Sequence, residues 1–311
     1  MSLEVQGQPS PGPHAVGEAA RRSRYCVACG AHHARPLFRD LVTCSACGMI
    51  YYPHRLAPEE VTRLYSEAYF GGAEYYDYLA DRPVHEANFR ARVRQLARWL
   101  PRGRHLLEVG CSYGFFLNLA RARWRVRGCD IATEPCRYAR EILGLDVLAG
   151  DFLEIPLARD EVDALCLWDT IEHLEDAEGY LARAADVLKP GGILALSTGD
   201  IGSWLARWQG PRWRQIHPPT HLWYFSRQTM RRTLDRFGFE MCWFRRIGLA
   251  RSVGQIVYSL TSLRRAEPSL AHRFCMWSGL GRLKLWLNTF DLMMVVARRR
   301  GPTATALEDS R

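Results

Sequence analysis

The stretch that decides the fold is LLEVGCSYG, residues 106–114, in which an apolar run enters a turn that carries Gly110, Ser112 and Gly114. A helical segment follows at once. A turn of this kind lets a ligand approach the backbone closely and exposes amides at the N-terminus of the helix. The G-x-G-x-x-G spacing of dinucleotide-binding turns is missing, because Ser112 stands where a middle glycine would be. The stretch therefore predicts a nucleotide-binding strand, turn and helix, without naming the nucleotide.

Short apolar runs alternate with helical segments from His105 onward, and this alternation predicts a parallel sheet with crossover helices. The Lys189-Pro190-Gly191-Gly192 run predicts the end of the last of these helices. The expected helices are Gly114–Arg123, Glu134–Leu143 and Ala177–Leu188. The expected strands are His105–Gly110, Arg125–Asp130, Asp146–Asp151, Val162–Asp169, Ile193–Ser197, Phe239–Arg246 and Asp291–Ala297.

Acidic residues stand at the ends of four successive strands. Glu108 lies near the end of the first, and Asp130, Asp151 and Asp169 end the next three. In an open parallel sheet the carboxyl ends of the strands converge on the crevice that binds ligands. Asp130 follows Gly110 by 20 residues, the spacing at which a carboxylate accepts ribose hydroxyls. One such acid can be a helix cap, but four at successive ends indicate a site.

Together these motifs resemble those of class I S-adenosylmethionine-dependent methyltransferases, over about residues 104–200. The resemblance implies an α/β fold with a Rossmann-like seven-stranded sheet and helices on both faces. The segments that carry it are EVGCSYG (108–114), GCDI (128–131), GDF (150–152), WDTIEHL (168–174) and LKPGG (188–192).

The resemblance also implies individual contacts with S-adenosylmethionine. Gly110, Ser112 and Gly114 would line the methionine moiety, with Glu108 near its amino group. Asp130 would bind the ribose. The remaining implied contacts are adenine packing by Ile131, adenine hydrogen bonding by Asp151 beside Phe152, and a wall at the sulfonium end from Trp168 and Asp169.

The segment HPPTHLWYFS (217–226) resembles the subgroup that holds many small-molecule and sugar-pathway methyltransferases. An N-terminal cysteine ribbon is also similar to that of certain sugar methyltransferases, although their large additional C-terminal domain has no counterpart here. The expected acceptor is therefore a small or carrier-linked molecule, with a saccharide or glycan-pathway intermediate as the first choice.

Two near-copies of a cysteine knuckle precede the main domain, Cys26-Val-Ala-Cys29-Gly and Cys44-Ser-Ala-Cys47-Gly. Two residues between cysteines let both sulfurs reach one tetrahedral ion, and the glycine permits the tight turn. Four protein ligands leave no open position, so we expect a structural Zn²⁺ site. The ribbon is either a folding element or a docking surface for a substrate or partner.

A general base assists methyl transfer when the nucleophile is a hydroxyl or an acidic carbon. His221 in the proline-rich loop and His173 after the fourth strand are the candidates, and His221 is preferred. The alternatives are that His173 shapes the site and that His221 holds the loop. Tyr224 is a weaker choice because an ordinary tyrosine has a pKa of about 10.

Two further segments allow two interpretations each. Aromatic and arginine side chains of residues 204–223 would suit a sugar ring and a phosphate, or they pack the loop. Apolar and basic residues mix on helical spacing in residues 249–289, as in a surface that meets a membrane or lipid-linked substrate. The alternative is a helical cap or a dimer contact. The first segment contains Trp204, Trp208, Trp213, Trp223, Arg207, Arg212 and Arg214.

The 311 residues are 48% hydrophobic and carry a net charge of +9, which suits a globular chain and leaves an anionic partner open. No run is apolar and long enough for a membrane span, and no signal peptide is evident, so we expect a cytoplasmic protein, with peripheral membrane contact through 249–289.

The rival hypotheses are a nucleic-acid methyltransferase or nucleic-acid-binding protein that uses the ribbon and basic surface, and a binding module without turnover. Oligomeric state is left open. The expected division is a disordered leader (1–23), ribbon (24–53), helical linker or lid (54–100), methyltransferase domain (101–248 with 290–300), helical insertion (249–289) and disordered tail (301–311).

Overall fold

The computed structural model describes residues 23–64, 78–261 and 269–301. Its centre is a seven-stranded sheet in the order β10-β13-β8-β7-β4-β5-β6. Strands β6, β5, β4, β7 and β8 run parallel, and β13 lies antiparallel between β8 and β10. The predicted fold class, a Rossmann-like α/β sheet of seven strands, is confirmed. The strands are β4 (His105–Val109), β5 (Arg125–Asp130), β6 (Val147–Ala149), β7 (Val162–Trp168), β8 (Leu188–Gly199), β10 (Phe239–Arg246) and β13 (Leu292–Arg299).

The strands at the centre of the sheet contain continuous apolar runs, which are buried because helices cover both faces. Residues Ala164 to Trp168 of β7 and Ile193 to Leu196 of β8 are all buried. Continuous apolar runs are typical of parallel strands packed on both sides. The expected strand at Ile193–Ser197 is longer in the structure, because β8 already pairs with β7 at Leu188 and, after a shift of register at the glycine turn, pairs again from Ile193.

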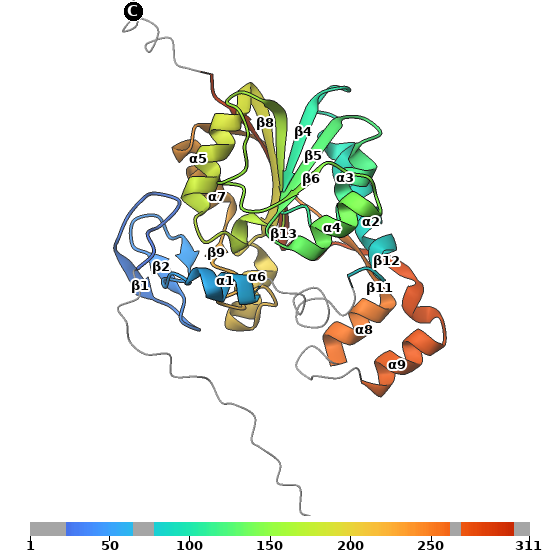
Figure 1. Cartoon of the computed structure of the whole chain (residues 1–311). Coiled ribbons are helices and arrows are strands. Elements are labelled where there is room, and N and C mark those ends of the chain that lie inside the picture. The colour runs from blue at the N-terminus through green and yellow to red at the C-terminus, as the bar shows by residue number, and fades with distance from the viewer. Residues whose placement is uncertain (1–22, 65–77, 262–268, 302–311) are drawn as a thin grey trace, which may run out of the picture.

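Helices cover both faces of the sheet, as Figure 1 shows. Helices α5 (Ala177–Val187) and α7 (Arg227–Arg236) lie on one face, and α2 (Arg82–Leu96), α3 (Phe115–Ala120) and α4 (Thr133–Glu141) lie on the other. Asp176 caps α5 by accepting a hydrogen bond from the Gly179 backbone amide. The cap fixes where the chain leaves the carboxyl edge of the sheet, and short polar caps of this kind are preferred at helix starts.

The cysteine module is joined to the main domain by a strand. Its strands β1 (Ala34–Pro36), β2 (Val42–Cys44) and β3 (Ile50–Tyr51) continue into β9 (Trp223–Tyr224), which belongs to the loop after β8. Ile50 pairs with Tyr224, and Tyr51 pairs with Trp223. The module therefore shares a four-stranded sheet with the segment that contains His221.

Residues 249–287 form a separate unit beside the carboxyl ends of the parallel strands. It contains β11 (Leu249–Ser252), α8 (Val253–Thr261), α9 (Leu270–Trp277), the 3₁₀ turn η4 (Leu280–Arg282) and β12 (Lys284–Leu287). Strands β11 and β12 pair antiparallel. The segment is thus not helical throughout, because a two-stranded ribbon joins its helices to the domain. In Figure 1 this unit and the cysteine module lie on opposite sides of the lower end of the sheet.

The remaining elements lie near the same end of the sheet. They are α1 (Pro58–Leu64), the 3₁₀ turns η2 (Ile171–His173) and η3 (Gly210–Arg212), and α6 (Trp204–Gln209). Several parts of the expected division fall outside the described residues. Among them are residues 65–77 of the expected linker or lid, the leader to residue 22 and the tail from residue 302. Among the described residues, no helix has the length and apolar character needed to cross a membrane.

Candidate active site

A cavity of about 1390 Å³ lies at the carboxyl ends of the parallel strands. Pockets for one drug-sized ligand span about 300–1,000 Å³, so this cavity exceeds the usual volume of a pocket for a single ligand. One wall comes from the strand ends and from α2, and the opposite wall comes from the 249–287 unit. The predicted site residues on the first wall are Gly110, Ser112, Asp130, Ile131, Asp151, Phe152, Trp168, Asp169, His173 and His221.

Close packing and backbone hydrogen bonds hold the glycine turn in place. Gly110 has φ of +76°, and a Cβ there would lie 2.6 Å from Thr170 Oγ1. The Ser112 amide donates to Asp130 Oδ2 at 2.8 Å, and the Ala132 amide donates to Asp130 Oδ1 at 2.8 Å. Burial raises the pKa of Asp130 above its usual value, and these backbone hydrogen bonds oppose that rise. Asp130 thus joins the turns after β4 and β5 and still has lone pairs for a ligand.

Asp151 lies at the next strand end with a partner that the sequence analysis did not identify. Its Oδ1 accepts hydrogen bonds from Tyr180 Oη at 2.7 Å and from the Leu153 amide at 2.8 Å. Phe152 is buried with its ring centroid 5.5 Å from that of Tyr180, whereas Ile131 is 42% exposed at the cavity wall. Tyr180 lies on α5, so only the tertiary packing brings it to this site.

Two predicted cofactor residues lie behind the cavity wall. Glu108 is fully buried under the turn, and its Oε2 has no hydrogen-bond partner. Burial raises its pKa well above the ordinary value, with Arg92 opposing the rise. Gly114 begins α3 with φ of +72°, and a Cβ there would lie 2.7 Å from Leu145 Cδ1. Neither residue lines the cavity, so their placement supports the turn rather than a direct ligand contact.

Arg92 is a cavity residue that the sequence analysis did not single out. It lies on α2, is almost fully buried, and its Nη2 donates to Asp169 Oδ2 at 2.6 Å. Its guanidinium carbon lies 5.2 Å from the centroids of both the Trp168 and Phe89 rings. Asp169 also accepts from Ser197 Oγ at 3.0 Å. A buried cation therefore faces the cavity where the sulfonium end was predicted. Because several arginines occur between residues 88 and 100, the sequence gave no reason to single out Arg92.

The two predicted catalytic histidines meet on the cavity wall. The ring centroids of His173 and His221 are 4.5 Å apart, and His173 Nδ1 lies 2.9 Å from Thr220 O. His221 Nδ1 lies 3.0 Å from Gln215 O. Burial lowers the pKa of His173 to about 4 and lowers that of His221 well below its ordinary value. Both imidazoles are therefore neutral near pH 7, and a low pKa makes each a weak base.

The third candidate base is buried away from the cavity. Tyr224 Oη donates to His221 O at 3.1 Å, and the residue does not line the cavity. Burial raises its pKa above the ordinary value. Its position in β9 makes it a support for the loop.

The tryptophans and arginines of residues 204–223 do not form one site. Trp213 and Trp223 are buried, with indole hydrogen bonds to Asp291 Oδ2 at 2.8 Å and Leu174 O at 2.8 Å. Trp204 and Trp208 are exposed on α6 and stack on each other with ring centroids 5.8 Å apart. Of the seven side chains in this predicted cluster, Arg214 alone lines the cavity, as far as the described residues show.

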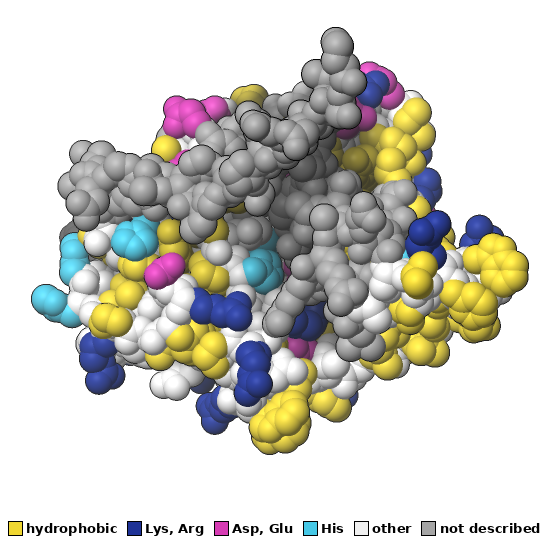
Figure 2. Space-filling model, turned by 90° about the horizontal axis from the view of Figure 1, so that it is seen from below, with side chains coloured by type: hydrophobic (Ala, Val, Ile, Leu, Met, Phe, Trp, Pro, Cys, Tyr) yellow, Lys and Arg dark blue, Asp and Glu magenta, His cyan; other side chains and the backbone are white. Residues whose placement is uncertain are grey.

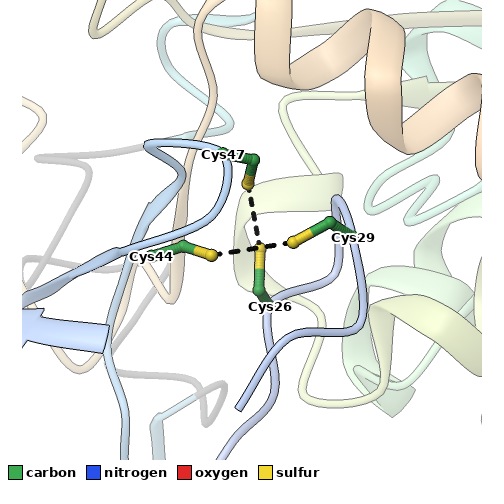
Figure 3. A group of neighbouring side chains, drawn as sticks. All are labelled: Cys26, Cys29, Cys44 and Cys47. Carbon is green, nitrogen blue, oxygen red and sulfur yellow. Dashed lines mark hydrogen bonds between the residues drawn. The ribbon is translucent and has the colours of Figure 1, made fainter. Parts of the chain in front are cut away.

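The four cysteines of the knuckles converge, as Figure 3 shows. Cys26 Sγ lies 3.4 Å from Cys47 Sγ, and Cys29 Sγ lies 3.6 Å from Cys44 Sγ. Tetrahedral Zn–S bonds of about 2.3 Å place sulfurs roughly 3.8 Å apart, so the four thiols fit a zinc ion. The amides of Gly30 and Gly48 donate to the first cysteine carbonyl of each knuckle, and both glycines have positive φ. The two turns are therefore built in the same way.

Comparison with known families decides the class of protein. A family model described as "Methyltransferase domain" matches residues 78–242, which are 165 of the 311 residues. The chain belongs to this family. Membership of a methyltransferase family agrees with the class of protein that the sequence motifs predicted.

Curated relatives of this methyltransferase match part of their length. It is 35% identical over 102 residues to a Mycolicibacterium smegmatis protein named "Probable S-adenosylmethionine-dependent methyltransferase", covering 31% of this chain and 38% of that one. It is 30% identical to malonyl-[acyl-carrier protein] O-methyltransferase of Serratia marcescens, over 42% of this chain and 51% of the relative. With ubiquinone biosynthesis O-methyltransferase of Cereibacter sphaeroides the identity is 27%, over 52% and 72%. The methyltransferase thus spans less than two thirds of the first two.

Solved structures share the fold at low sequence identity. A chain of the complex between the Haloferax volcanii Trm112 methyltransferase activator and a methyltransferase superposes with a TM-score of 0.51 at 19% identity, over 71% of this chain and 94% of that one. A methyltransferase from Archaeoglobus fulgidus gives 0.50 at 18% identity, over 72% and 100%. At these identities the likeness shows the fold alone.

Proposed function

We propose that the methyltransferase binds S-adenosylmethionine on the strand-end wall of the cavity and transfers its methyl group to an oxygen of a small, lipid-linked or carrier-linked acceptor held beneath the 249–287 unit. The observation that carries this proposal is the composition of the cavity. One wall holds the glycine turn and the acids that were predicted to bind a nucleoside, and the other belongs to a unit whose outer surface is apolar and basic.

The cofactor half follows from the residues on the strand ends. Asp130 would accept the ribose hydroxyls, and Asp151 with Tyr180 would bind the adenine edge beside Phe152 and Ile131. Arg92 offers a buried guanidinium for the carboxylate of the methionine moiety, since planar guanidinium groups suit carboxylates. Trp168 and Asp169 would border the sulfonium. Gly110 and Ser112 of the turn line the cavity, where they would meet the methionine moiety.

The sulfonium methyl is already electrophilic, so the protein needs to align an acceptor oxygen and exclude water. The acceptor oxygen would approach from the side of His173 and His221, which lie next to Asp169 along the wall. Because both Nδ1 atoms face backbone carbonyls, each ring carries its lone pair on Nε2. His221 as general base therefore remains a prediction, although its low pKa weakens that role.

The acceptor half is bounded by side chains of mixed character. Arg251, Gln255, Tyr258, His272 and Lys284 line it from the 249–287 unit. Two relatives are named as O-methyltransferases of malonyl-acyl carrier protein and of ubiquinone biosynthesis, and these names support an oxygen acceptor on a carrier or a lipid. A saccharide acceptor also remains a prediction. The tryptophans expected to stack on a sugar ring do not line this cavity, so the site favours a lipid-linked molecule.

The outer surface of the unit supports contact with an anionic bilayer. Trp277 is 82% exposed and Leu270 is 81% exposed. In Figure 2 hydrophobic side chains gather with Lys and Arg at the right edge, the side on which α8 and α9 lie in Figure 1. Residues 249–290 contain six Lys or Arg and one acidic residue. The other exposed apolar side chains of this surface are Phe274, Met276, Leu280, Leu283, Leu285, Trp286, Leu287 and Phe290.

Charge complementarity selects the lipid class. Arg273, Arg282 and Lys284 are exposed among these apolar side chains, and no ion pair joins them to an acidic residue in the described part of the chain. Basic residues close to a surface gain about 1 kcal/mol each from anionic lipid, and aromatic residues suit the interface. Exposed apolar patches of this extent are uncommon on monomers without a partner. The surface therefore suits a bilayer that contains anionic lipid.

The cysteine module is proposed to hold one structural zinc ion through Cys26, Cys29, Cys44 and Cys47. The convergence of the four sulfurs supports this. Bound zinc would cross-link the two knuckles, and so hold β3 in place beside β9.

Two measurements test the proposal. Methyl-labelled S-adenosylmethionine is incubated with the protein and with either a chloroform extract or an aqueous extract of the source cells. Label in a chloroform-soluble, alkali-stable product is the expected result. Label confined to water-soluble products would exclude a lipid-linked acceptor, and no transfer to either extract by folded protein would count against the methyl-transfer reaction itself.

Membrane contact is tested by sedimentation with vesicles of phosphatidylcholine alone or with phosphatidylglycerol. We expect binding that requires the anionic lipid and is lost in Trp277→Ser/Trp286→Ser. Ile142→Ser is the matched control, because Ile142 is 65% exposed at the C-terminal cap of α4, outside this surface. If the tryptophan variant and the Ile142 variant bind the vesicles equally well, this surface is not the membrane contact. A dimer that the tryptophan variant disrupts, without any vesicle binding, would assign the surface to a second copy of the chain.

A further inference from the structure

Three side chains on the acceptor side of the cavity form a cluster of a different kind from the cysteine knuckles. Glu172 and His173 belong to η2, and His221 belongs to the loop before β9. All three line the cavity, and one potential ligand atom from each lies within 4.8 Å of the others. A backbone hydrogen bond from Leu222 N to Glu172 O at 2.8 Å joins the two segments. The cluster is therefore part of the fixed structure of the wall.

The hydrogen bonds of the two rings select the atoms that face a ligand. A carbonyl oxygen accepts only, so the contacts of His173 Nδ1 with Thr220 O and of His221 Nδ1 with Gln215 O place the ring protons on Nδ1. The lone pairs then lie on Nε2 in both rings. Metal-binding histidines usually donate their other ring N–H to a carbonyl or carboxylate, which fixes the tautomer and the ring orientation. Both histidines have that second contact already.

Glu172 supplies a carboxylate whose burial calls for a cation or a proton donor. Its side chain is 3% exposed, and its Oε2 has no hydrogen-bond partner. An uncompensated buried charge is costly. The Asp169 carboxylate, four residues from His173, adds negative charge on the same wall. Two imidazole nitrogens and one carboxylate are a donor set for divalent transition metals, and Mg²⁺ or Ca²⁺ would instead take oxygen ligands.

We propose that Glu172, His173 and His221 bind a divalent transition-metal ion, such as Zn²⁺ or Fe²⁺, through the carboxylate and the two Nε2 atoms. Three protein ligands leave at least one coordination position open toward the cavity, as in catalytic metal sites. The knuckles, with four thiolates, leave none. The chain would then hold two metals with different tasks, one structural and one facing the acceptor.

The open position would take the acceptor oxygen. This step rests on the proposed methyl transfer, whereas metal binding does not. A hydroxyl that binds the ion releases its proton to solvent, because a bound cation stabilises the oxyanion. A lone pair of that oxygen then forms the new C–O bond as the S–C bond of the cofactor breaks, and the electron pair of the broken bond remains on sulfur. The ion would thereby do what a histidine of low pKa does poorly.

Metal content distinguishes the cluster from the knuckles. Purified full-length protein is equilibrated with Zn²⁺, freed of unbound metal by gel filtration and analysed by mass spectrometry for zinc per chain. We expect two zinc ions per chain in the native protein and one in His173→Ala/His221→Ala. His217→Ala is the matched control and should keep two, since His217 has its ring 3.9 Å from that of His221 but lies outside the ligand set. Glu172→Gln should weaken the second site by roughly tenfold or more.

Cobalt provides a readout that does not depend on activity. With zinc in the knuckles, added Co²⁺ should give the weak visible bands of nitrogen and oxygen coordination, without thiolate charge transfer. Glu172→Gln, which changes few atoms, serves if the double variant does not fold. One zinc per folded native chain, or two in both the native protein and Glu172→Gln with unchanged affinity, would overturn the proposal. If the native protein binds two zinc ions but transfers no methyl group, the metal site stands and only the proposed reaction is rejected.

Discussion

Tyr51, in the last strand of the cysteine module, pairs antiparallel with Trp223, two residues after His221. The pairing joins the module to the loop that carries His221 on the cavity wall, although residues 23–54 lie far from that loop in sequence. Arg24 strengthens the connection, because its guanidinium donates to Glu175 and to Tyr52 O and lies 5.1 Å from the Trp223 ring centroid. The knuckles therefore bear on the position of His221.

Removal of zinc should consequently impair the reaction more than cofactor binding. Cys29→Ser/Cys47→Ser is expected to lose zinc from the knuckles, to unfold at a lower temperature and to lose most methyl transfer. Its affinity for S-adenosylmethionine should stay within a few fold, because Asp130 ends β5 and Asp151 follows β6, both outside the module. Calorimetric binding and label transfer measure the two effects. Cys242→Ser, at an exposed cysteine outside the cluster, is the control; equal loss of binding and turnover would argue against a selective role.

Arg92 should discriminate between ligands with and without an amino-acid moiety. Arg92→Gln removes the guanidinium that faces the cavity, and a lost charged hydrogen bond costs ~1.5–3 kcal/mol, so S-adenosylmethionine should bind roughly tenfold or more weakly. Methylthioadenosine, which lacks the carboxylate, should bind the variant and the native protein alike. Arg90→Gln, at an exposed neighbour on α2, should change neither affinity. If Arg92→Gln binds both ligands more weakly by the same factor, the substitution has disturbed the structure of the site in general.

Gly110 should tolerate no side chain. Gly110→Ala would place a Cβ 2.6 Å from Thr170 Oγ1 at a positive φ, so we expect both the free energy of unfolding and cofactor affinity to fall. Gly103 has the same φ of +76° but no atom within 4 Å of a Cβ. Gly103→Ala therefore reports the backbone cost alone, about 1–2 kcal/mol. Chemical denaturation of both variants measures the difference, and equal destabilisation would refute the close contact.

Asp291 should make stability depend on pH. Burial by itself raises the pKa of Asp291, but Arg214, Thr289 and Trp213 outweigh burial and hold it below the ordinary value. A depressed folded-state pKa stabilises the fold above the unfolded pKa of about 4, and this contribution is lost as pH falls through the folded value. Asp291→Asn should thus be destabilised at pH 7 and approach the native protein in acid. Urea unfolding from pH 7 into acid measures the difference in the free energy of unfolding between the two proteins. A difference that grows in acid would contradict a lowered pKa for Asp291.

The sequence predicted the sheet closely because its strands are short apolar runs between strong turn signals. The bounds of β10 match the expected Phe239–Arg246, and those of β5 match Arg125–Asp130. The 249–287 unit was harder to predict. Its β11 and β12 carry the same mix of apolar and basic residues as its helices, so periodicity did not separate a strand from a helix there.

Within the candidate site, the sequence could predict only those residues that lie at the ends of the strands. Asp130, Asp151 and Asp169 follow strands, and their convergence follows from the parallel sheet. Arg92 and Tyr180 reach the cavity from helices on opposite faces of the sheet, and only their packing gives that position. The sequence left two roles open for Trp213, ligand binding or packing of the loop, and in the structure its buried indole donates to Asp291.

The central claim is that the strand-end wall of the cavity binds S-adenosylmethionine through Asp130. Isothermal titration calorimetry on zinc-loaded protein tests it most directly, with Asp130→Ala as the variant. Asp146→Ala is the control, because Asp146 is an exposed aspartate that directly precedes β6 and does not line the cavity. We predict micromolar binding by the native protein and the control, and loss of binding in Asp130→Ala. Undiminished binding by Asp130→Ala, or no binding by folded native protein, would contradict the account.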